Sequence, residues 1–165
     1  MQFSLNKPAR LGKTQLILID GQAGAGKTTL ANVLKEELCC DVIHLEYLYN
    51  GWDDALTQTL TDNLIALCNS IKLGKSHWLP IYDWEINAFN SEREILPSEK
   101  LIIEGVGAGQ TAIRHYASSL IWVDADPDVA LDRVMKRDGF RYPEEISRWK
   151  IREAAHFEQI GRAHV

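Results

Sequence analysis

A glycine-rich stretch near the start of the chain carries the clearest chemistry. Gly21, Gly26, Lys27 and Thr28 satisfy the pattern G-x-x-x-x-G-K-[ST] without a mismatch. Glycines let the backbone curl until successive N–H groups point into one concavity, and a helix starting near Lys27 adds its positive end there. Lys27 can reach the outer phosphates of a nucleotide, and the Thr28 hydroxyl can bind Mg²⁺. The stretch therefore predicts a nucleoside triphosphate site; the alternative is an ordinary glycine-rich turn, which the Lys-Thr pair argues against.

Acidic residues follow three of the predicted strands. Glu46, Glu104 and Asp124 come after the apolar segments Asp41–Leu45, Leu101–Ile103 and Leu120–Val123. In a parallel sheet with helices on both faces, ligands bind beyond the carboxyl ends of the strands. Phosphoryl transfer needs one acid near Mg²⁺ and one that takes the acceptor's proton.

We assign the metal role to Glu104 and the base role to Glu46. The alternatives are a turn or capping carboxylate for Glu104 and a solvated loop residue for Glu46. Asp124 is better explained as structural, because the run Asp124-Ala-Asp126-Pro127 also marks the start of a helix.

Two further clusters have both a functional and a structural interpretation. Tyr82-Asp83-Trp84 could stack on a planar ring and accept a hydroxyl, although periodicity alone slightly favours a hydrophobic strand edge with a turn. Arg133 and Arg137 lie four residues apart on one predicted helix face. They fit either a mobile lid that neutralises phosphate charge or a solvated helix face, and the sequence does not decide between these. They belong to the main basic concentration, which also includes Lys136, Arg141, Arg148 and Arg152.

The elements that must position these residues alternate between strand and helix. Gln15–Asp20 is a predicted buried strand, and Thr28–Leu38 has helical apolar spacing at Leu30, Val33, Leu34 and Leu38. Further helices are expected over Asp54–Lys72, Ala112–Ala117, Asp128–Arg137 and Glu144–Glu158, and Trp78–Asn90 is aromatic-rich and interrupted by Pro80. This alternation predicts an α/β fold with a parallel sheet covered on both faces.

Bulk properties narrow the class of protein. The chain has 165 residues, 45% of them hydrophobic, and a net charge of -5. It is long enough for one domain, with residues 1–14 as an N-terminal extension. The absence of a Lys/Arg block argues against a nucleic-acid surface, and no apolar run approaches a membrane span. Cys39, Cys40 and Cys68 suit neither a zinc site nor a disulfide framework, so we expect a cytoplasmic protein.

Taken together, the segments resemble a known family. The phosphate-binding loop is followed in order by "HLEYLYNGWD", "LPIYDWE", "LIIEGVGA" and "RVMKRDG". From about Gln15 to Phe157 this resembles the uridine kinase-like branch of the P-loop nucleoside and nucleotide kinases. The resemblance implies a three-layer α/β/α P-loop NTPase fold, ATP and Mg²⁺ as cofactors, and a small-molecule phosphoacceptor, with neither nucleic acid nor membrane as a partner.

The resemblance also implies roles for individual residues. Glu46 becomes the catalytic carboxylate, Thr28 and Glu104 the metal partners, and Arg133 and Arg137 the lid arginines. Tyr82, Asp83 and Trp84 would contact the acceptor. The nucleotide would contact the loop residues Gly21, Ala23, Gly24, Ala25, Gly26, Lys27, Thr28 and Thr29.

Two departures from the family pattern concern the acceptor. The family usually has Asp where this chain has Glu46, and it has a His and an Arg that read the pyrimidine where Glu85, Ile86 and Asn87 stand here. We therefore expect a nucleoside or another small hydroxyl compound. The alternatives are a nucleotide kinase, which would need arginines near Glu46 and Tyr82, and an ATP-binding or ATPase module without a small acceptor.

The last six residues have a separate explanation. Ile160–Val165 read "IGRAHV", which is the translation of ATC GGA AGA GCA CAC GTC, a stretch of a common short-read sequencing adapter that continues into a TGA stop codon. We therefore expect residues 160–165 to be a non-native tail. The fold's last strand, which would flank Leu120–Val123, is then expected to be missing from this sequence.

Overall fold

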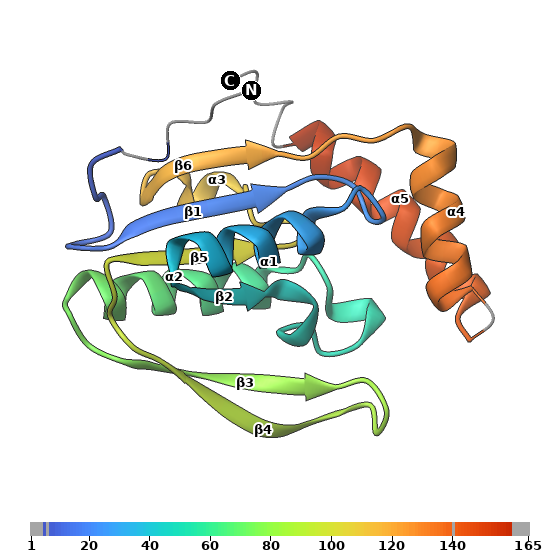
Figure 1. The fold of residues 1–165 in the computed structure, drawn as a ribbon. Coiled ribbons are helices and arrows are strands. Elements are labelled where there is room, and N and C mark those ends of the chain that lie inside the picture. The colour runs from blue at the N-terminus through green and yellow to red at the C-terminus, as the bar shows by residue number, and fades with distance from the viewer. Residues whose placement is uncertain (1–4, 6, 140, 160–165) are drawn as a thin grey trace.

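A four-stranded parallel sheet forms the centre of the molecule. The structure is a computed structural model that describes residue 5, residues 7–139 and residues 141–159. The sheet order is β2-β5-β1-β6, with β1 spanning Gln15–Asp20, β2 Asp41–His44, β5 Lys100–Glu104 and β6 Ala117–Trp122. All four carboxyl ends therefore reach the same edge of the sheet (Figure 1).

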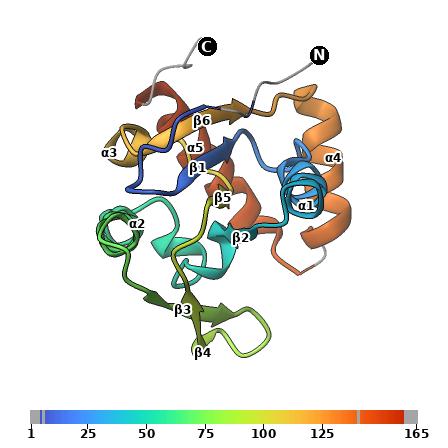
Figure 2. The same cartoon turned by 60° about the vertical axis from the view of Figure 1, so that its left-hand side comes forward.

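Helices cover both faces of this sheet, as predicted. Alternate residues of β1 enter different cores, because successive strand side chains point to opposite faces. Ile17 and Ile19 pack in a cluster with residues of α1 (Lys27–Leu38), whereas Leu16 and Leu18 join the larger cluster that includes α2 (Gln58–Lys72). Figure 2 shows α1 and α4 (Pro127–Asp138) on one side and α2 and α3 (Thr111–Arg114) on the other. The fold is thus a three-layer α/β/α arrangement, completed by α5 (Pro143–Gln159).

An antiparallel hairpin projects below β2 (Figure 1). Its strands are β3 (His77–Asp83) and β4 (Ala88–Ile95). The apolar pattern predicts only a strand edge with a turn, at residues 82–84, because Pro80 interrupts the segment. In this two-stranded ribbon Pro80 lies opposite Glu92, and a proline is tolerated where the strand has a free edge. Arg93 links the hairpin to the main sheet by donating to the Val42 carbonyl (2.8 Å) and the Asp41 carboxylate (3.0 Å).

Two predicted helices have different boundaries in the structure. The helix predicted over residues 54–72 begins at Gln58, because Leu56 has a φ of 62° and the Thr57 hydroxyl donates to the Asp54 carbonyl. Two short 3₁₀ turns precede it, η1 (Leu45–Tyr47) and η2 (Trp52–Asp54). The helix predicted over residues 112–117 covers only Thr111–Arg114, and Ala117 already begins β6.

The ends of the described chain show how the sheet is bordered. Leu11 is fully buried in the larger core, and the Ser118 hydroxyl donates to the Pro8 carbonyl (2.8 Å). Within the described residues β6 pairs only with β1. The predicted non-native tail, residues 160–165, lies outside the described residues. Within the described part of the chain, every helix is too short or too polar to cross a membrane.

Candidate active site

The glycine-rich loop between β1 and α1 has the backbone that its sequence predicts. Gly21, Gly24 and Gly26 all have positive φ angles, of 145°, 80° and 102°. A Cβ added at Gly21 would lie 2.1 Å from the Val123 carbonyl oxygen, and one at Gly24 would lie 2.2 Å from that of Ala130. These positions therefore need glycine for space as well as for conformation.

The start of α1 is suited to an anion. Its first residue is Lys27, and neither a capping side chain nor an acidic residue stands in its first turn. The first N–H groups of a helix lack partners within the helix, and the helix dipole favours negative charge at this end. The residues present therefore fit a bound phosphate.

Lys27 is held within the loop. Its Nζ donates to the carbonyls of Gly21 (2.9 Å) and Gln22 (2.8 Å), and the residue is only 7% exposed. Burial lowers the pKa of Lys27, and the nearby carboxylates of Asp20 and Glu104 oppose this shift. The ammonium is thus placed among backbone carbonyls that it can leave for a phosphate.

Asp20, the last residue of β1, was not predicted to belong to the site. Its fully buried carboxylate accepts the backbone N–H groups of Gly21 (2.7 Å), Gly107 (3.1 Å) and Gly109 (2.8 Å). It therefore fastens the phosphate loop to the loop that follows β5. One feature of the sequence could have pointed to this role: an acidic residue ends a largely apolar strand directly before the glycine-rich motif.

The two predicted metal partners meet in the structure. The Thr28 hydroxyl donates to Glu104 Oε1 at 3.1 Å, and the same oxygen lies 2.5 Å from His44 Nδ1. Glu104 is 3% exposed. Among the described residues no group of three or more His, Cys, Asp or Glu side chains is arranged to hold a metal ion. The Thr28–Glu104 pair fits Mg²⁺, which is commonly bound through few protein ligands together with substrate phosphates and water.

Glu46 lies in η1, just beyond the carboxyl end of β2. Burial raises the pKa of Glu46, the charge of Glu104 raises it further, and Arg137 acts in the opposite direction. The Trp84 indole N–H donates to the backbone carbonyl of Glu46 at 3.0 Å. Glu46 is thus a partly buried carboxylate on which the charges of Glu104 and of Arg137 in α4 act.

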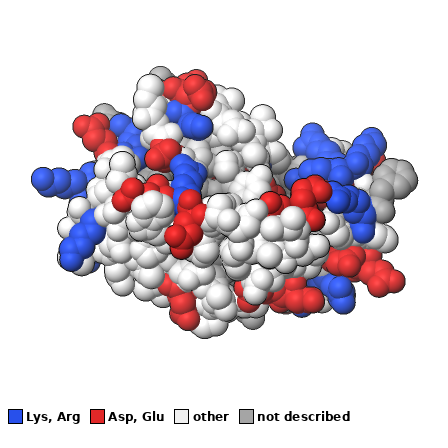
Figure 3. Space-filling view, turned by 90° about the horizontal axis from the view of Figure 1, so that it is seen from below, with Lys and Arg blue, Asp and Glu red and all other residues white. Residues whose placement is uncertain are grey.

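The two predicted lid arginines, both on α4, have different contacts. Arg133 donates to the Gly24 carbonyl at 3.1 Å and so touches the phosphate loop. Arg137 forms an ion pair with its neighbour Asp138, with a 2.8 Å contact, while its charge acts on Glu46 and Lys27. Figure 3 shows lysine and arginine side chains gathered at the α4 end of the face that it presents.

The predicted acceptor residues lie on the hairpin. Tyr82 is 5% exposed, and its ring packs edge-on against Trp84 (5.0 Å between centroids) and Phe89 (5.3 Å). Asp83 accepts from the Glu85 backbone N–H (2.8 Å) and the Asn90 side chain (2.9 Å), which closes the hairpin turn.

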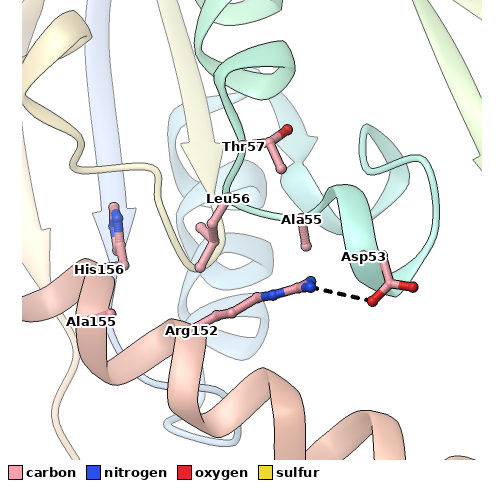
Figure 4. Close-up of a pocket in the computed structure, with 7 residues that line it drawn as sticks. All are labelled: Asp53, Ala55, Leu56, Thr57, Arg152, Ala155 and His156. Carbon is pink, nitrogen blue, oxygen red and sulfur yellow. Dashed lines mark hydrogen bonds and ion pairs between the residues drawn. The ribbon is translucent and has the colours of Figure 1, made fainter.

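A pocket of about 340 Å³ lies between α5 and the segment before α2 (Figure 4). Arg152 crosses it to the Trp52 carbonyl (2.7 Å) and the Asp53 carboxylate (3.2 Å). The volume is at the lower end of the range for small-molecule sites. The lining residues are Asp53, Ala55, Leu56, Thr57, Arg152, Ala155 and His156. The sequence pointed to Arg152 only as part of a basic concentration, because its partner lies 99 residues away.

Comparisons with known proteins identify similar sequences and a similar fold. The family model described as an AAA domain matches residues 17–150. A uridine kinase from Alkaliphilus metalliredigens is 30% identical over 155 residues, which cover 81% of this chain and 70% of that protein. The chloroplastic uridine/cytidine kinase UKL1 of Arabidopsis thaliana is 25% identical over 141 residues, and the match covers 74% of this chain but only 29% of the plant protein.

Among solved structures, the chain is similar to one described as a possible uridine kinase from Bacillus stearothermophilus. The TM-score is 0.62 at 23% sequence identity, covering 92% of this chain and 87% of that one. At this identity the likeness concerns the fold.

Proposed function

Because the chain matches the AAA-domain family model and belongs to the uridine kinase-like P-loop kinases, we propose that it transfers the terminal phosphoryl group of ATP to a hydroxyl of a small molecule. The acceptor in this proposal is a nucleoside or a nucleoside-like alcohol. One observation carries it: Glu104 contacts Thr28 of the phosphate loop and acts electrostatically on both Lys27 and Glu46. The phosphate-binding groups and the candidate base thus meet around one buried carboxylate.

Each residue has a distinct role in the proposed reaction. Glu46 takes the proton of the acceptor hydroxyl, the acceptor oxygen bonds to the terminal phosphorus, and the bond between that phosphorus and the bridging oxygen breaks to leave ADP. Lys27 and Arg133 stabilise the negative charge on the transferring group. Thr28 and Glu104 would hold Mg²⁺, which when bound neutralises charge on the phosphate oxygens.

We place the acceptor between Glu46, the hairpin and the pocket crossed by Arg152. Asp53 and Arg152 offer an acceptor and a donor for hydroxyl groups there. Tyr82, Asp83 and Trp84 remain our proposed contacts on the hairpin side. Glu85, which replaces a residue that reads the pyrimidine in the family, binds Arg141 through both carboxylate oxygens, at 3.1 Å and 3.4 Å. This pairing supports an acceptor whose head group differs from an unmodified pyrimidine.

Charge pairing distinguishes the proposal from a nucleotide kinase. An acceptor phosphate needs cations that are available to bind it. On the acceptor side, Arg141 and Arg152 are each paired with a carboxylate, of Glu85 and Asp53 respectively. Arg93 contacts Asp41 at the amino end of β2, away from Glu46. This arrangement favours an uncharged hydroxyl acceptor.

The test is ADP release from ATP and Mg²⁺ with a panel of acceptors. The panel contains nucleosides, vitamins with a primary hydroxyl and, as a separate arm, nucleoside monophosphates. We expect at least one alcohol to raise ADP release well above the background rate. Stimulation by monophosphates alone would support a nucleotide kinase, and hydrolysis indifferent to every compound would support an ATPase module.

A further inference from the structure

Glu153 on α5 is a buried acid that the proposed reaction does not use. The residue is only 4% exposed. Its Oε1 accepts the backbone N–H of Ala23, inside the phosphate loop, and its Oε2 lies 3.3 Å from Lys150 Nζ. Its charge also acts on Lys27, where it opposes the effect of burial on the lysine pKa. A carboxylate thus stands beside two groups of the loop that suit an anion.

The position of Glu153 indicates which phosphate of a bound nucleotide it would compete with. Its neighbour Arg152 crosses to the acceptor side, where it contacts Trp52 and Asp53. Glu153 itself contacts the phosphate loop, which lies beside α5 (Figure 1). It therefore stands where the phosphate loop meets α5, the helix that also lines the proposed acceptor pocket. In phosphoryl transfer the phosphate that faces the acceptor is the terminal one.

We propose that Glu153 is an internal anion that occupies the place of the terminal phosphate on the loop and gives up the Ala23 N–H when ATP binds. Two negative groups cannot share one partly buried N–H donor without strong repulsion. ATP must therefore displace Glu153, and the displaced carboxylate keeps Lys150 as its partner. ADP lacks the terminal phosphate and leaves the Glu153 contact in place. This inference rests on the proposed function, because it takes ATP as the ligand of the loop.

Helix α5 contacts both the phosphate loop and the acceptor pocket. Arg152 and Glu153 are consecutive residues, so the helix that contacts the phosphate loop through Glu153 also holds Arg152 in the acceptor pocket. Binding of ATP, but not of ADP, is thereby communicated to the acceptor side.

The test is the equilibrium affinity of Glu153→Gln for ATP and for ADP, measured by calorimetry. The substitution removes the charge and keeps an oxygen that can accept from Ala23. We expect ATP to bind about tenfold more tightly than to the wild type, because a like-charge clash is relieved, while ADP affinity changes by less than about threefold. Glu158→Gln, on an exposed position of the same helix, is the control for a change of charge and leaves both affinities unchanged.

The other outcomes separate the inference from its premise. Equal changes for ATP and ADP, or weaker ATP binding by Glu153→Gln, overturn the role of Glu153 while the proposed kinase stands. A wild type that binds neither nucleotide contradicts both. If the Gln variant fails to fold, Glu153→Asp answers the same question, because its shorter side chain withdraws the carboxylate from Ala23. It is expected to show the same preferential gain for ATP.

Discussion

On the phosphate side of the site, the contacts run through the backbone and are buried. Asp20 accepts three backbone N–H groups, and Lys27 donates to two backbone carbonyls. On the acceptor side, the contacts run between side chains of segments that are distant in the sequence, Asp53 with Arg152 and Glu85 with Arg141. The carboxylates of these pairs are exposed, by 75% for Asp53 and 73% for Glu85. A short motif with its flanking elements can specify the first kind of site. The second kind depends on individual side chains and can change its substrate while the fold stays the same.

The largest expected effect is on the phosphate side, at Lys27. Lys27→Ala removes the ammonium that we propose to stabilise the transferring group, so we expect kcat/KM to fall by about 10³ to 10⁵, the range for a charged group with this role. The measurement is ADP release with the best acceptor from the panel. Lys35→Ala, an exposed lysine on the same helix, is the matched control. Equal activity of the two variants would remove the phosphate-loop assignment.

The next effect is at Glu46, where the two sides meet. Glu46→Gln keeps the shape but cannot take a proton, so we expect kcat to fall by about 10² to 10⁴ with ATP affinity nearly unchanged. If kcat barely moves, Asp53 or Asp83 becomes the candidate base. Glu46→Asp restores the residue usual in the family, and a faster variant would show that the longer side chain limits the tested reaction.

Glu46 also predicts a dependence on pH. A base acts in its deprotonated form, so the rate falls as the pH drops through its pKa. Because burial raises the pKa of Glu46 above its ordinary value of 4.5, the acid limb of the kcat profile is expected above that pH. The limb should be lost in Glu46→Gln; a wild-type limb at or below the ordinary value would contradict this role.

Asp20 tests whether the backbone contacts fix the phosphate side. Asp20→Asn places an amide N–H₂ group among three N–H donors, so we expect the free energy of unfolding to fall by about 2 to 3 kcal/mol. ATP affinity should fall with it, since the loop loses its anchor. Chemical denaturation and calorimetry measure the two quantities. Asp124→Asn, an exposed acid after the neighbouring strand, should be close to neutral, and equal losses in both variants would count against the anchor.

The smallest effect is expected on the acceptor side, at the exposed pair of Arg141 and Glu85. Exposed ion pairs contribute little, so Arg141→Ala should change the acceptor KM by less than about threefold. Glu85→Ala should do the same, and the double variant should add nothing. A tenfold rise in KM for one variant alone would instead show that this side chain contacts the acceptor.

The same contrast explains what could be predicted from the sequence. The phosphate loop depends on neighbouring residues, and the meeting of Thr28 with Glu104 follows from parallel strands that end at one edge. Beyond a strand edge with a turn at residues 82–84, the hairpin escaped prediction because Pro80 interrupts the strand pattern, and a two-stranded ribbon tolerates that proline. Glu153 contacts Ala23 from 130 positions away, so no local pattern could mark it. Side-chain pairs of this kind become visible only once α5 is placed against the loop.

The central claim is that the terminal phosphate of ATP passes to an alcohol and not to water. The most direct measurement is a single turnover with ATP labelled in its terminal phosphate, with and without the best acceptor from the panel, followed by separation of the products. We expect labelled acceptor phosphate in the wild type, formed far faster than labelled inorganic phosphate, and neither product at a comparable rate in Lys27→Ala. Labelled inorganic phosphate as the main product, at the same rate with and without acceptor, would contradict it.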